Sequence, residues 1–479
     1  MPAEYLVVSD LHICDVEEHD DGWKSYKSAR FLIDDEFGHL LSRATQRKGE
    51  AGNAEPMTLI LNGDIVDFDL VNAVPDEPLF PVSAFERKRG LLPTAEKSAW
   101  KLARVLADHP VFVRALARFL SAGHRIVYVM GNHDREMHFT GVQRVLLDAL
   151  AQAAAAEGGR FPPEAVRFEP WFYYVPGEIY AEHGQQYDYY SSFKHVLSPV
   201  VQTRSGPMIA LPMGDLANRY LIGVMGFFNP HASDFILNVF RYLSHWLRYY
   251  AFSRRSLVVN WIWGSFLVMA QLLLLKKRVH QRPVNYDACL SHAARRARLP
   301  VASVAALGEL QPPPITTRFF RVAREFWVDR LVVASIMTTS TISLALLPVP
   351  LWLKLMVPLS SFPLLYFIYE WLVKGDTIFT VEKEIPAVAR RIAQLLGVKV
   401  VTFGHTHVPR VVPLAKGVSF VDTGTWAPMT SKLETAGAMP GFRNYLRVRF
   451  RGGEASLRLD SWESAGEPGV PSKSVAIAS

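Results

Sequence analysis

Five short clusters of acidic, amide and imidazole side chains have the chemistry of metal ligands. They are Asp10-Leu11-His12, Gly63-Asp64-Ile65-Val66-Asp67, Gly131-Asn132-His133-Asp134, His183-Gly184 and Gly404-His405-Thr406-His407. Carboxylate oxygen, amide oxygen and imidazole nitrogen suit Mn, Fe or Zn rather than thiolate-seeking ions. Two such ions, roughly 3.5–4 Å apart, can clamp a phosphate and lower the pKa of a bridging water. A site of that kind needs about seven ligands, including a bridging carboxylate, and the clusters contain enough of them.

Each cluster directly follows a short apolar run that is typical of a β-strand. The runs are Tyr5–Val8, Thr58–Leu61, Ile126–Met130, Ile179–Ala181 and Val398–Phe403. Stretches with apolar residues at three- and four-residue spacing predict helices between the early strands, at Glu96–Leu106, Val111–Leu120 and Val142–Ala156. Alternating strands and helices indicate a layered α/β domain, in which ligands bind outside the carboxyl ends of the strands. Three more strands are predicted at Ser419–Val421, Tyr445–Arg449 and Ser456–Leu459.

In this order, the clusters resemble those of the calcineurin-like metallophosphoesterase superfamily: D-x-H, G-D-x-x-D, G-N-H-D, H-G and G-H-x-H. The resemblance covers residues 1–190 and 376–462, which we expect to form the two parts of one domain. It implies a layered sandwich of two mixed β-sheets flanked by helices. It also implies hydrolysis of a phosphoester or phosphoanhydride by a hydroxide that bridges two divalent metal ions, with Mn expected first and Fe or Zn as alternatives.

The resemblance implies a role for nine residues. One ion would be bound by Asp10, His12 and His407, the other by Asn132, His183 and His405, and Asp64 would bridge both. His133 would stabilise or protonate the leaving oxygen, and Asp67 would orient the His133 imidazole. Taken singly, each residue is equally explained as a strand-end cap or a core histidine. Their joint occurrence favours the metal site.

Other residues of the same types fit no ligand position. We expect the following histidines to be surface or core residues: His19, His109, His138, His195 and His292. Cys14 is interpreted as a small buried hydrophobe. Asp188 is expected either to support His183 from behind or to be a solvated loop carboxylate.

A long basic segment, residues 191–375, separates the two parts of the domain. It contains 20 Lys and Arg against 7 Asp and Glu, in a chain whose net charge is +7. Leu331–Val373 is long enough for two membrane crossings, with Pro348 and Pro350 placed to turn the chain. Because both parts of the site must lie on one side, the number of crossings is even. We therefore expect a hairpin at 331–373 and an in-plane or re-entrant segment at 257–275; the alternative is a soluble domain with two buried helices.

The flanking charges predict the side of the membrane. Lys276, Arg278, Arg295 and the basic residues up to Arg324 indicate the cytoplasmic side by the positive-inside rule, and anionic lipid is the expected partner.

The start of the sequence has no basic n-region of a signal peptide. The two cysteines cannot form a disulfide framework. Residues 463–479 are rich in Gly, Pro and Ser, which predicts a disordered tail.

These features together predict a phosphoester or diphosphate hydrolase at the cytoplasmic membrane face, with a substrate that carries a lipid. More distantly, the chain is similar to the UDP-2,3-diacylglucosamine diphosphatases, although they have Arg at the position of His133 and a shorter insertion. Two alternatives stay open: a tethered phosphatase or phosphodiesterase for soluble nucleotides, and a non-catalytic interaction protein on the same fold. Nucleic acid is a poor partner, because the basic residues lie beside apolar runs instead of alternating with aromatic residues.

Overall fold

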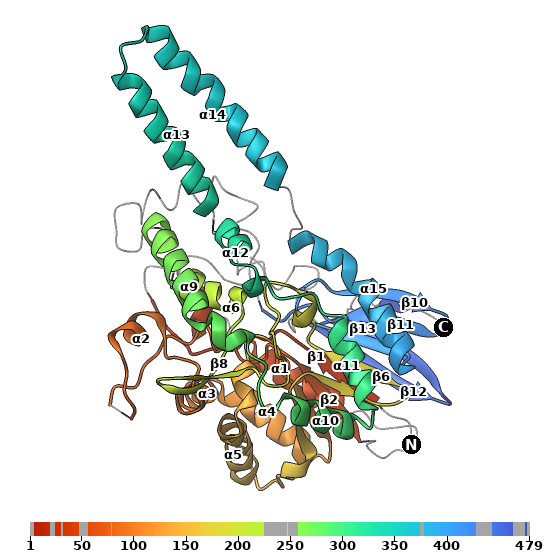
Figure 1. Ribbon diagram of the computed structural model, residues 1–479. Helices are drawn as coiled ribbons and strands as arrows, with labels where there is room; N and C mark the ends of the chain where they lie inside the picture. Colours follow the sequence, from red (N-terminus) through yellow and green to blue (C-terminus); the bar gives the residue numbers. More distant parts are fainter. Residues whose placement is uncertain are drawn as a thin grey trace.

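The computed structural model describes residues 4–19, 24–29, 32–46, 56–77, 79–224, 247, 257–326, 328–373, 378–427, 443–462 and 475–476. Over these ranges the protein is α/β, with two mixed β-sheets and helices around them (Figure 1). A two-stranded ribbon and several further helices lie between the strands of the second sheet in the sequence. The α/β architecture with mixed sheets is therefore confirmed.

The larger sheet joins the two ends of the chain. Within the described residues it has seven strands in the order β14-β13-β12-β1-β2-β3-β4. The central strand β1 (Glu4–Val8) pairs in parallel with β2 (Met57–Asn62) and antiparallel with β12 (Asn444–Arg451). The remaining strands are β3 (Arg125–Val129), β4 (Val166–Glu169), β13 (Glu454–Ser461) and β14 (Val475–Ala476). Residues more than 400 positions apart are thus neighbours in one sheet.

The smaller sheet has the same mixed character. Its strand order over the described residues is β10-β11-β9-β6-β5. Strands β6 (Ile179–Glu182), β9 (Val400–Phe403) and β11 (Val418–Asp422) are parallel to one another. The antiparallel outer strands are β5 (Phe172–Tyr174) and β10 (Arg410–Ala415). All strands predicted from the sequence are present, within one or two residues of their predicted ends.

The two sheets face each other across an apolar core. Val7, Ile60 and Val129 from the larger sheet pack in one cluster with Ala181, Val400 and Val421 from the smaller. The other face of the larger sheet is covered by α1 (Asp34–Thr45), α3 (Ala95–Asp108), α4 (Pro110–Ser121) and α5 (Thr140–Ala156). Helix α15 (Ile378–Leu396) covers the smaller sheet. This layered packing fixes the strand ends that carry the candidate ligands.

Residues 191–375 are mainly helical where the structure describes them. The helices are α6 (Met213–Tyr220), α9 (Leu257–His280), α10 (Tyr286–Ala297), α11 (Val301–Glu309), α12 (Phe319–Glu325), α13 (Val328–Leu346) and α14 (Leu351–Val373). The ribbon is formed by β7 (Val200–Thr203) and β8 (Gly206–Ile209). The short elements of the chain are α2 (Ala84–Arg89) and the 3-10 helices η1 (Ser25–Lys27), η3 (Arg135–His138), η4 (Pro163–Ala165), η5 (Gln185–Tyr187), η6 (Ile222–Val224) and η7 (Ile315–Thr317).

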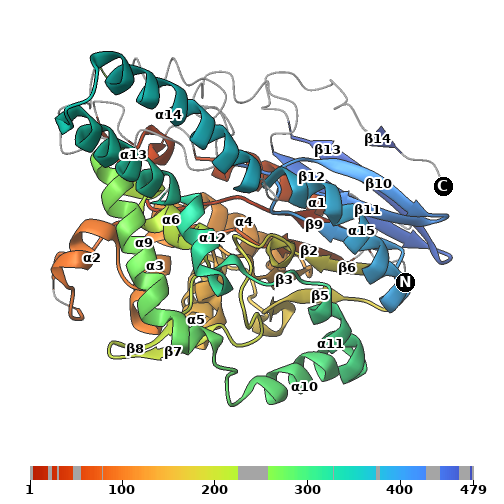
Figure 2. The ribbon, with the colours of Figure 1, turned by 45° about the horizontal axis from the view of Figure 1, so that its top comes forward.

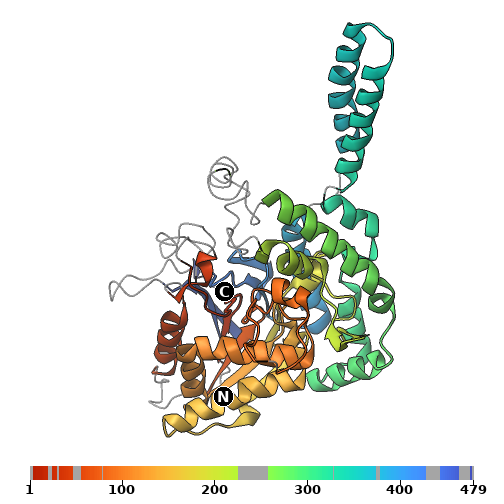
Figure 3. The same ribbon diagram turned by 90° about the vertical axis from the view of Figure 1, so that its left-hand side faces the viewer.

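Helices α13 and α14 form a hairpin that projects away from the rest of the molecule (Figures 1 and 3). Val328–Leu346 and Leu351–Trp371 are long and apolar enough to cross a membrane, and at most 6% of either apolar window is buried. Helix α9 covers the segment 257–275 and runs without a break along the body of the molecule (Figure 2). The predicted disordered tail lies outside the described residues, except for β14.

Candidate metal centre

The five polar clusters lie at the carboxyl ends of five strands. Asp10 and His12 follow β1, and the parallel neighbours β2 and β3 are followed by the clusters that begin at Gly63 and Gly131. His183 follows β6, and the cluster from Gly404 follows β9. Backbone hydrogen bonds tie these ends together, such as Asp10 N to Gly63 O at 3.0 Å and Gly404 N to His183 O at 2.8 Å. The clusters therefore meet at one edge of the sandwich.

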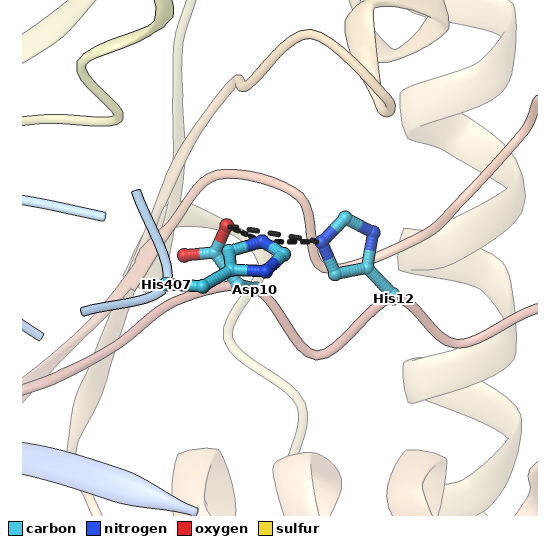
Figure 4. A group of neighbouring side chains, drawn as sticks. All are labelled: Asp10, His12 and His407. Atoms are coloured by element: carbon cyan, nitrogen blue, oxygen red, sulfur yellow. Dashed lines mark hydrogen bonds and ion pairs between the residues drawn. The ribbon is translucent and has the colours of Figure 1, made fainter. Parts of the chain in front are cut away.

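Asp10, His12 and His407 form the first group of candidate ligands (Figure 4). Asp10 Oδ1 lies 3.1 Å from His407 Nε2 and 3.8 Å from His12 Nε2. The two imidazole nitrogens are 3.3 Å apart. One carboxylate oxygen and two imidazole nitrogens thus converge on a single point, which is the arrangement that a divalent ion requires.

Asp64, His183 and His405 form the second group, whose candidate ligand atoms all lie within 4.8 Å of one another. Asp64 Oδ2 is 2.9 Å from His183 Nε2. The other nitrogen of His183, Nδ1, lies 3.0 Å from the Asn62 backbone carbonyl and donates to it, so Nε2 is the atom left for a metal ion. Asp10 Oδ1 is only 3.9 Å from His183 Nε2, so the two groups are adjacent.

Asn132 is also held beside the second group. The backbone N–H of the next residue, His133, donates to Asp64 Oδ1 at 2.9 Å. The Asn132 side chain donates through Nδ2 to Asp215 Oδ1 at 3.0 Å. Its Oδ1 atom is buried and has no hydrogen-bond partner among the described residues. That oxygen is therefore available as a ligand.

Asp67 contacts the imidazole of His133. Its Oδ2 atom lies 3.2 Å from His133 Nδ1 and equally 3.2 Å from His12 Nδ1. Burial lowers the pKa of His133, but the carboxylates of Asp67 and Asp64 outweigh it and raise that pKa well above its usual value. The Asp67 carboxylate thus fixes the orientation of two imidazole rings: His12, a candidate metal ligand, and His133, a candidate acid.

The backbone at the site is held in an unusual conformation. Five of the eight non-glycine residues with positive φ in the described chain are candidate ligands: Asp10, His12, Asp64, His405 and His407. Such a conformation costs about 1–3 kcal/mol per residue and persists only where the surrounding structure enforces it. The adjacent glycines are required by close approach. A Cβ at Gly404 would lie 2.5 Å from Asp10 Oδ2, and one at Gly131 would lie 2.1 Å from Asp64 Oδ1.

The donor set fits divalent cations. Asp10 is fully buried, and burial raises the pKa of its carboxyl, yet His183 and His407 hold that pKa well below its usual range. Asp10 Oδ1 and His183 Nε2 lie 3.9 Å apart, and each faces another candidate ligand, His407 Nε2 at 3.1 Å and Asp64 Oδ2 at 2.9 Å respectively. Carboxylate and imidazole atoms gathered in this way are the ligand types of a divalent cation. Several His and Asp groups of this protein could therefore hold a metal ion.

Asp188 was expected either to support His183 or to be solvated; it is instead buried, with its Oδ2 3.0 Å from His405 Nε2. Three further residues near the centre were not expected there from the sequence. Asp215 and Asn218, from α6, contact Asn132 and His133. Asp69 Oδ2 lies 3.6 Å from His133 Nδ1. In the sequence, the spacing of Asp215 and Asn218 on one face of a mostly apolar helix was the available signal.

The histidines assigned to surface or core agree with that prediction. His109 is buried and lies 2.7 Å from Asp34 and 2.8 Å from the Cys14 carbonyl. His19 and His292 are exposed, and His138 and His195 are half-buried. Cys14 is half-buried, and burial raises the pKa of its thiol. None of the five histidines belongs to a candidate metal group in the described residues.

Comparison with known proteins does not assign this site to a family. Neither a scan against protein-family models nor a search of curated proteins returned a match for the chain.

Proposed function

We propose that this protein is a metal-dependent hydrolase of phosphoesters or phosphoanhydrides. The observation that carries the proposal is the convergence of side chains from distant parts of the chain on two adjacent ligand groups. His405 donates through its backbone N–H to Asp10, which is 395 positions earlier in the sequence. If these residues were only strand-end caps or core histidines, seven side chains of metal-ligand type would not be expected together at one edge of the sandwich.

Two divalent ions, Mn first with Fe or Zn as alternatives, would supply charge neutralisation and an activated water. Asp10, His12 and His407 would hold one ion, and Asn132, His183 and His405 the other. Asp64 is proposed to contribute to both; its Oδ2 lies 2.9 Å from His183 Nε2, and its Oδ1 accepts from the backbone N–H of His133. The left-handed backbone at five of these positions supports the assignment, because stored strain clusters at functional sites.

His133 is proposed to protonate the leaving oxygen. Its Nδ1 atom lies against Asp67, so the ring presents Nε2 as the proton donor. The imidazole side chain is 15% exposed, like those of His405 at 14% and His407 at 16%, so a substrate can reach this side of the site. Asp67 acts on this step indirectly, by fixing the tautomer and orientation of the ring.

We further propose that the α13–α14 hairpin anchors the protein in a membrane, with the metal centre on the cytoplasmic side. Helical segments of 19 and 21 residues are about 28–32 Å long, close to the ~30 Å hydrocarbon thickness. Arg330 pairs with Glu370 at 2.7 Å where the hairpin leaves the body. Lys354, at the far end, donates to the Ala345 carbonyl at 2.7 Å. Charges at both ends with an apolar middle are typical of a hairpin in lipid.

Helix α9 supports the same placement. One side of it is buried against the body, and Trp263 and Phe266 on the other side are more than half exposed. Figure 1 shows its lighter-green N-terminal end on the side of the body from which the hairpin projects. Exposed aromatic residues at that level favour the membrane interface, with anionic lipid as the partner of the basic residues that follow. A substrate carrying a lipid would then reach the site from the bilayer surface.

Hydrolysis of three substrates tests the proposal: bis(p-nitrophenyl) phosphate, p-nitrophenyl phosphate and a lipid diphosphate, each with and without detergent micelles. We expect Mn²⁺-dependent hydrolysis, fastest for the lipid diphosphate in micelles. Equal rates with and without micelles would point to a soluble nucleotide or phosphate ester. No hydrolysis of any substrate by the Mn²⁺-loaded protein would contradict the proposed activity and favour a non-catalytic interaction protein.

A further inference from the structure

Helix α6 presents a buried polar face to the metal centre. Asp215, Asn218 and Arg219 are at most 6% exposed in a helix of eight residues. Their spacing of three and four positions places them on one side of the helix. Burying three polar side chains on one short helix is costly unless they have partners or a task. Two of them, Asp215 and Asn218, contact the residues that follow β3.

Asp215 determines which way the Asn132 amide points. A carboxylate oxygen can only accept, so the Asn132 atom 3.0 Å from Asp215 Oδ1 must be the amide nitrogen, Nδ2. The amide oxygen then points away from Asp215. It is the atom that is buried and lacks a hydrogen-bond partner among the described residues. With the amide turned over, a nitrogen that cannot bind a cation would take that place.

Helix α6 is itself held in place from two sides. Arg89, the last residue of α2, donates through Nη1 to the Tyr220 carbonyl at 2.7 Å. On the other side, a Cβ at Gly264 of α9 would lie 2.8 Å from Leu221 Cδ1 and 2.9 Å from the Tyr220 carbonyl. Helices can approach this closely only where no side chain intervenes. The position of Asp215 is therefore set by rigid contacts, as a positioning group requires.

We propose that Asp215 is a positioning residue of the metal centre, supplied by the segment that separates the two parts of the α/β domain. It holds the Asn132 amide so that Oδ1 faces the second ligand group, Asp64, His183 and His405. This inference rests on the proposed function, because it assumes that this group binds an ion. It also means that the segment proposed to contact the membrane forms one wall of the centre.

The test is a Mn²⁺ titration followed by electron paramagnetic resonance, which counts bound ions without relying on turnover. In Asp215→Asn the new amide can donate as well as accept, so it no longer selects one orientation of Asn132. We expect the first ion to bind as in the unaltered protein. The second should bind about 10–100-fold more weakly, as is usual when an outer partner of a ligand is removed. Asp287→Asn, an exposed carboxylate on α10, is the matched control and should bind both ions normally.

A double-mutant cycle with Asn132→Ala separates positioning from a general loss of structure. If Asp215 acts through Asn132, adding Asp215→Asn to Asn132→Ala should not weaken the second ion further. Unchanged binding of the second ion in Asp215→Asn, or additive losses in the double variant, would overturn the inference. Two bound ions in the unaltered protein without hydrolysis would instead contradict the proposed function and leave the role of Asp215 standing.

Discussion

Backbone strain and burial at single residues are the strongest support for the proposed metal centre. His12 and Asp64 adopt φ values of 49° and 53°. Residues other than glycine seldom adopt this left-handed backbone conformation. Hydrogen bonds from their own backbone groups hold the turns, such as His12 N to Asp64 O at 2.9 Å. Glycine would adopt these φ values at a lower cost. The Asp and His side chains at these positions are therefore consistent with the proposed metal centre.

Replacing His133 tests the separation of binding from catalysis. His133→Ala should keep both ions, because the ring belongs to neither proposed ligand set, and should slow hydrolysis by roughly 10²–10⁴-fold. Metal content and turnover of bis(p-nitrophenyl) phosphate, measured on the same preparation, give both values. His292→Ala, at an exposed position, should change neither. Loss of bound metal in His133→Ala would show that the ring is a ligand and not the acid.

At the scale of elements, Glu86 joins α2 to α3 and should make stability depend on pH. Burial opposes its charge, but hydrogen bonds from Leu92 N, Lys97 and Ser83 outweigh this and lower the pKa of Glu86 from 4.5 to about 2. Since the folded pKa lies below the unfolded one, the stabilisation is complete above about pH 5 and disappears as pH falls towards 2.

Glu86→Gln should therefore destabilise the protein by about 1–3 kcal/mol at pH 7. The measurement is urea unfolding of both proteins between pH 3 and pH 7. The difference between the two unfolding free energies should stay constant down to about pH 5 and shrink as the pH falls further. A difference that stays constant over this range would contradict the assigned pKa, and no difference at pH 7 would contradict the contacts of Glu86.

The contact between α9 and α6 gives a second prediction at this scale. Gly264→Ala places a methyl group within 3 Å of Tyr220 and Leu221, so we expect α6 to shift and the second Mn²⁺ ion to bind more weakly. Gly308→Ala is the matched control, because Gly308 also lies in a helix but has open space around it. Gly308→Ala should raise the unfolding free energy by about 0.5–1 kcal/mol and leave metal binding unchanged. Equal metal binding in both variants would show that α6 and α9 are not coupled to the centre.

Most of the strands, and the ligand groups that follow them, could be predicted from the sequence. Runs such as Thr58–Leu61 are apolar, short and followed at once by the polar cluster, so local pattern and position agree. The spacing of Asp215 and Asn218 marks a polar face on α6, but the sequence does not show what that face contacts, because Asp215 and its partner Asn132 are 83 positions apart. The same holds for Asp188, whose partner His405 is 217 positions away.

The whole molecule combines a compact sandwich with an exposed apolar hairpin. Charged substitutions in the middle of α14 should release it from membranes, since a charge near the bilayer centre costs about 2.5–3.5 kcal/mol. Leu359 and Leu364 are 68% and 59% exposed, so Leu359→Glu with Leu364→Glu should leave the fold intact. The measurement is flotation with vesicles containing anionic lipid. Val284→Glu, at an exposed position outside the hairpin, is the control and should float with the vesicles like the unaltered protein.

Flotation that persists in the doubly substituted hairpin would show that another surface, such as the exposed side of α9, is sufficient for attachment. Failure of the unaltered protein to float would contradict the membrane placement altogether. Neither result would affect the metal centre, because its proposed ligands lie at strand ends of the sandwich and not in the hairpin.

The central claim is that both ends of the chain build one dinuclear metal centre around Asp64. The most direct test is the metal content of the purified protein after Mn²⁺ loading and dialysis, measured together with hydrolysis of bis(p-nitrophenyl) phosphate, in the unaltered chain and in Asp64→Ala. We predict two ions per chain and hydrolysis in the former, and loss of bound metal together with hydrolysis in the latter. Absence of bound metal in the unaltered chain, or a full metal complement with normal hydrolysis in Asp64→Ala, would contradict the account.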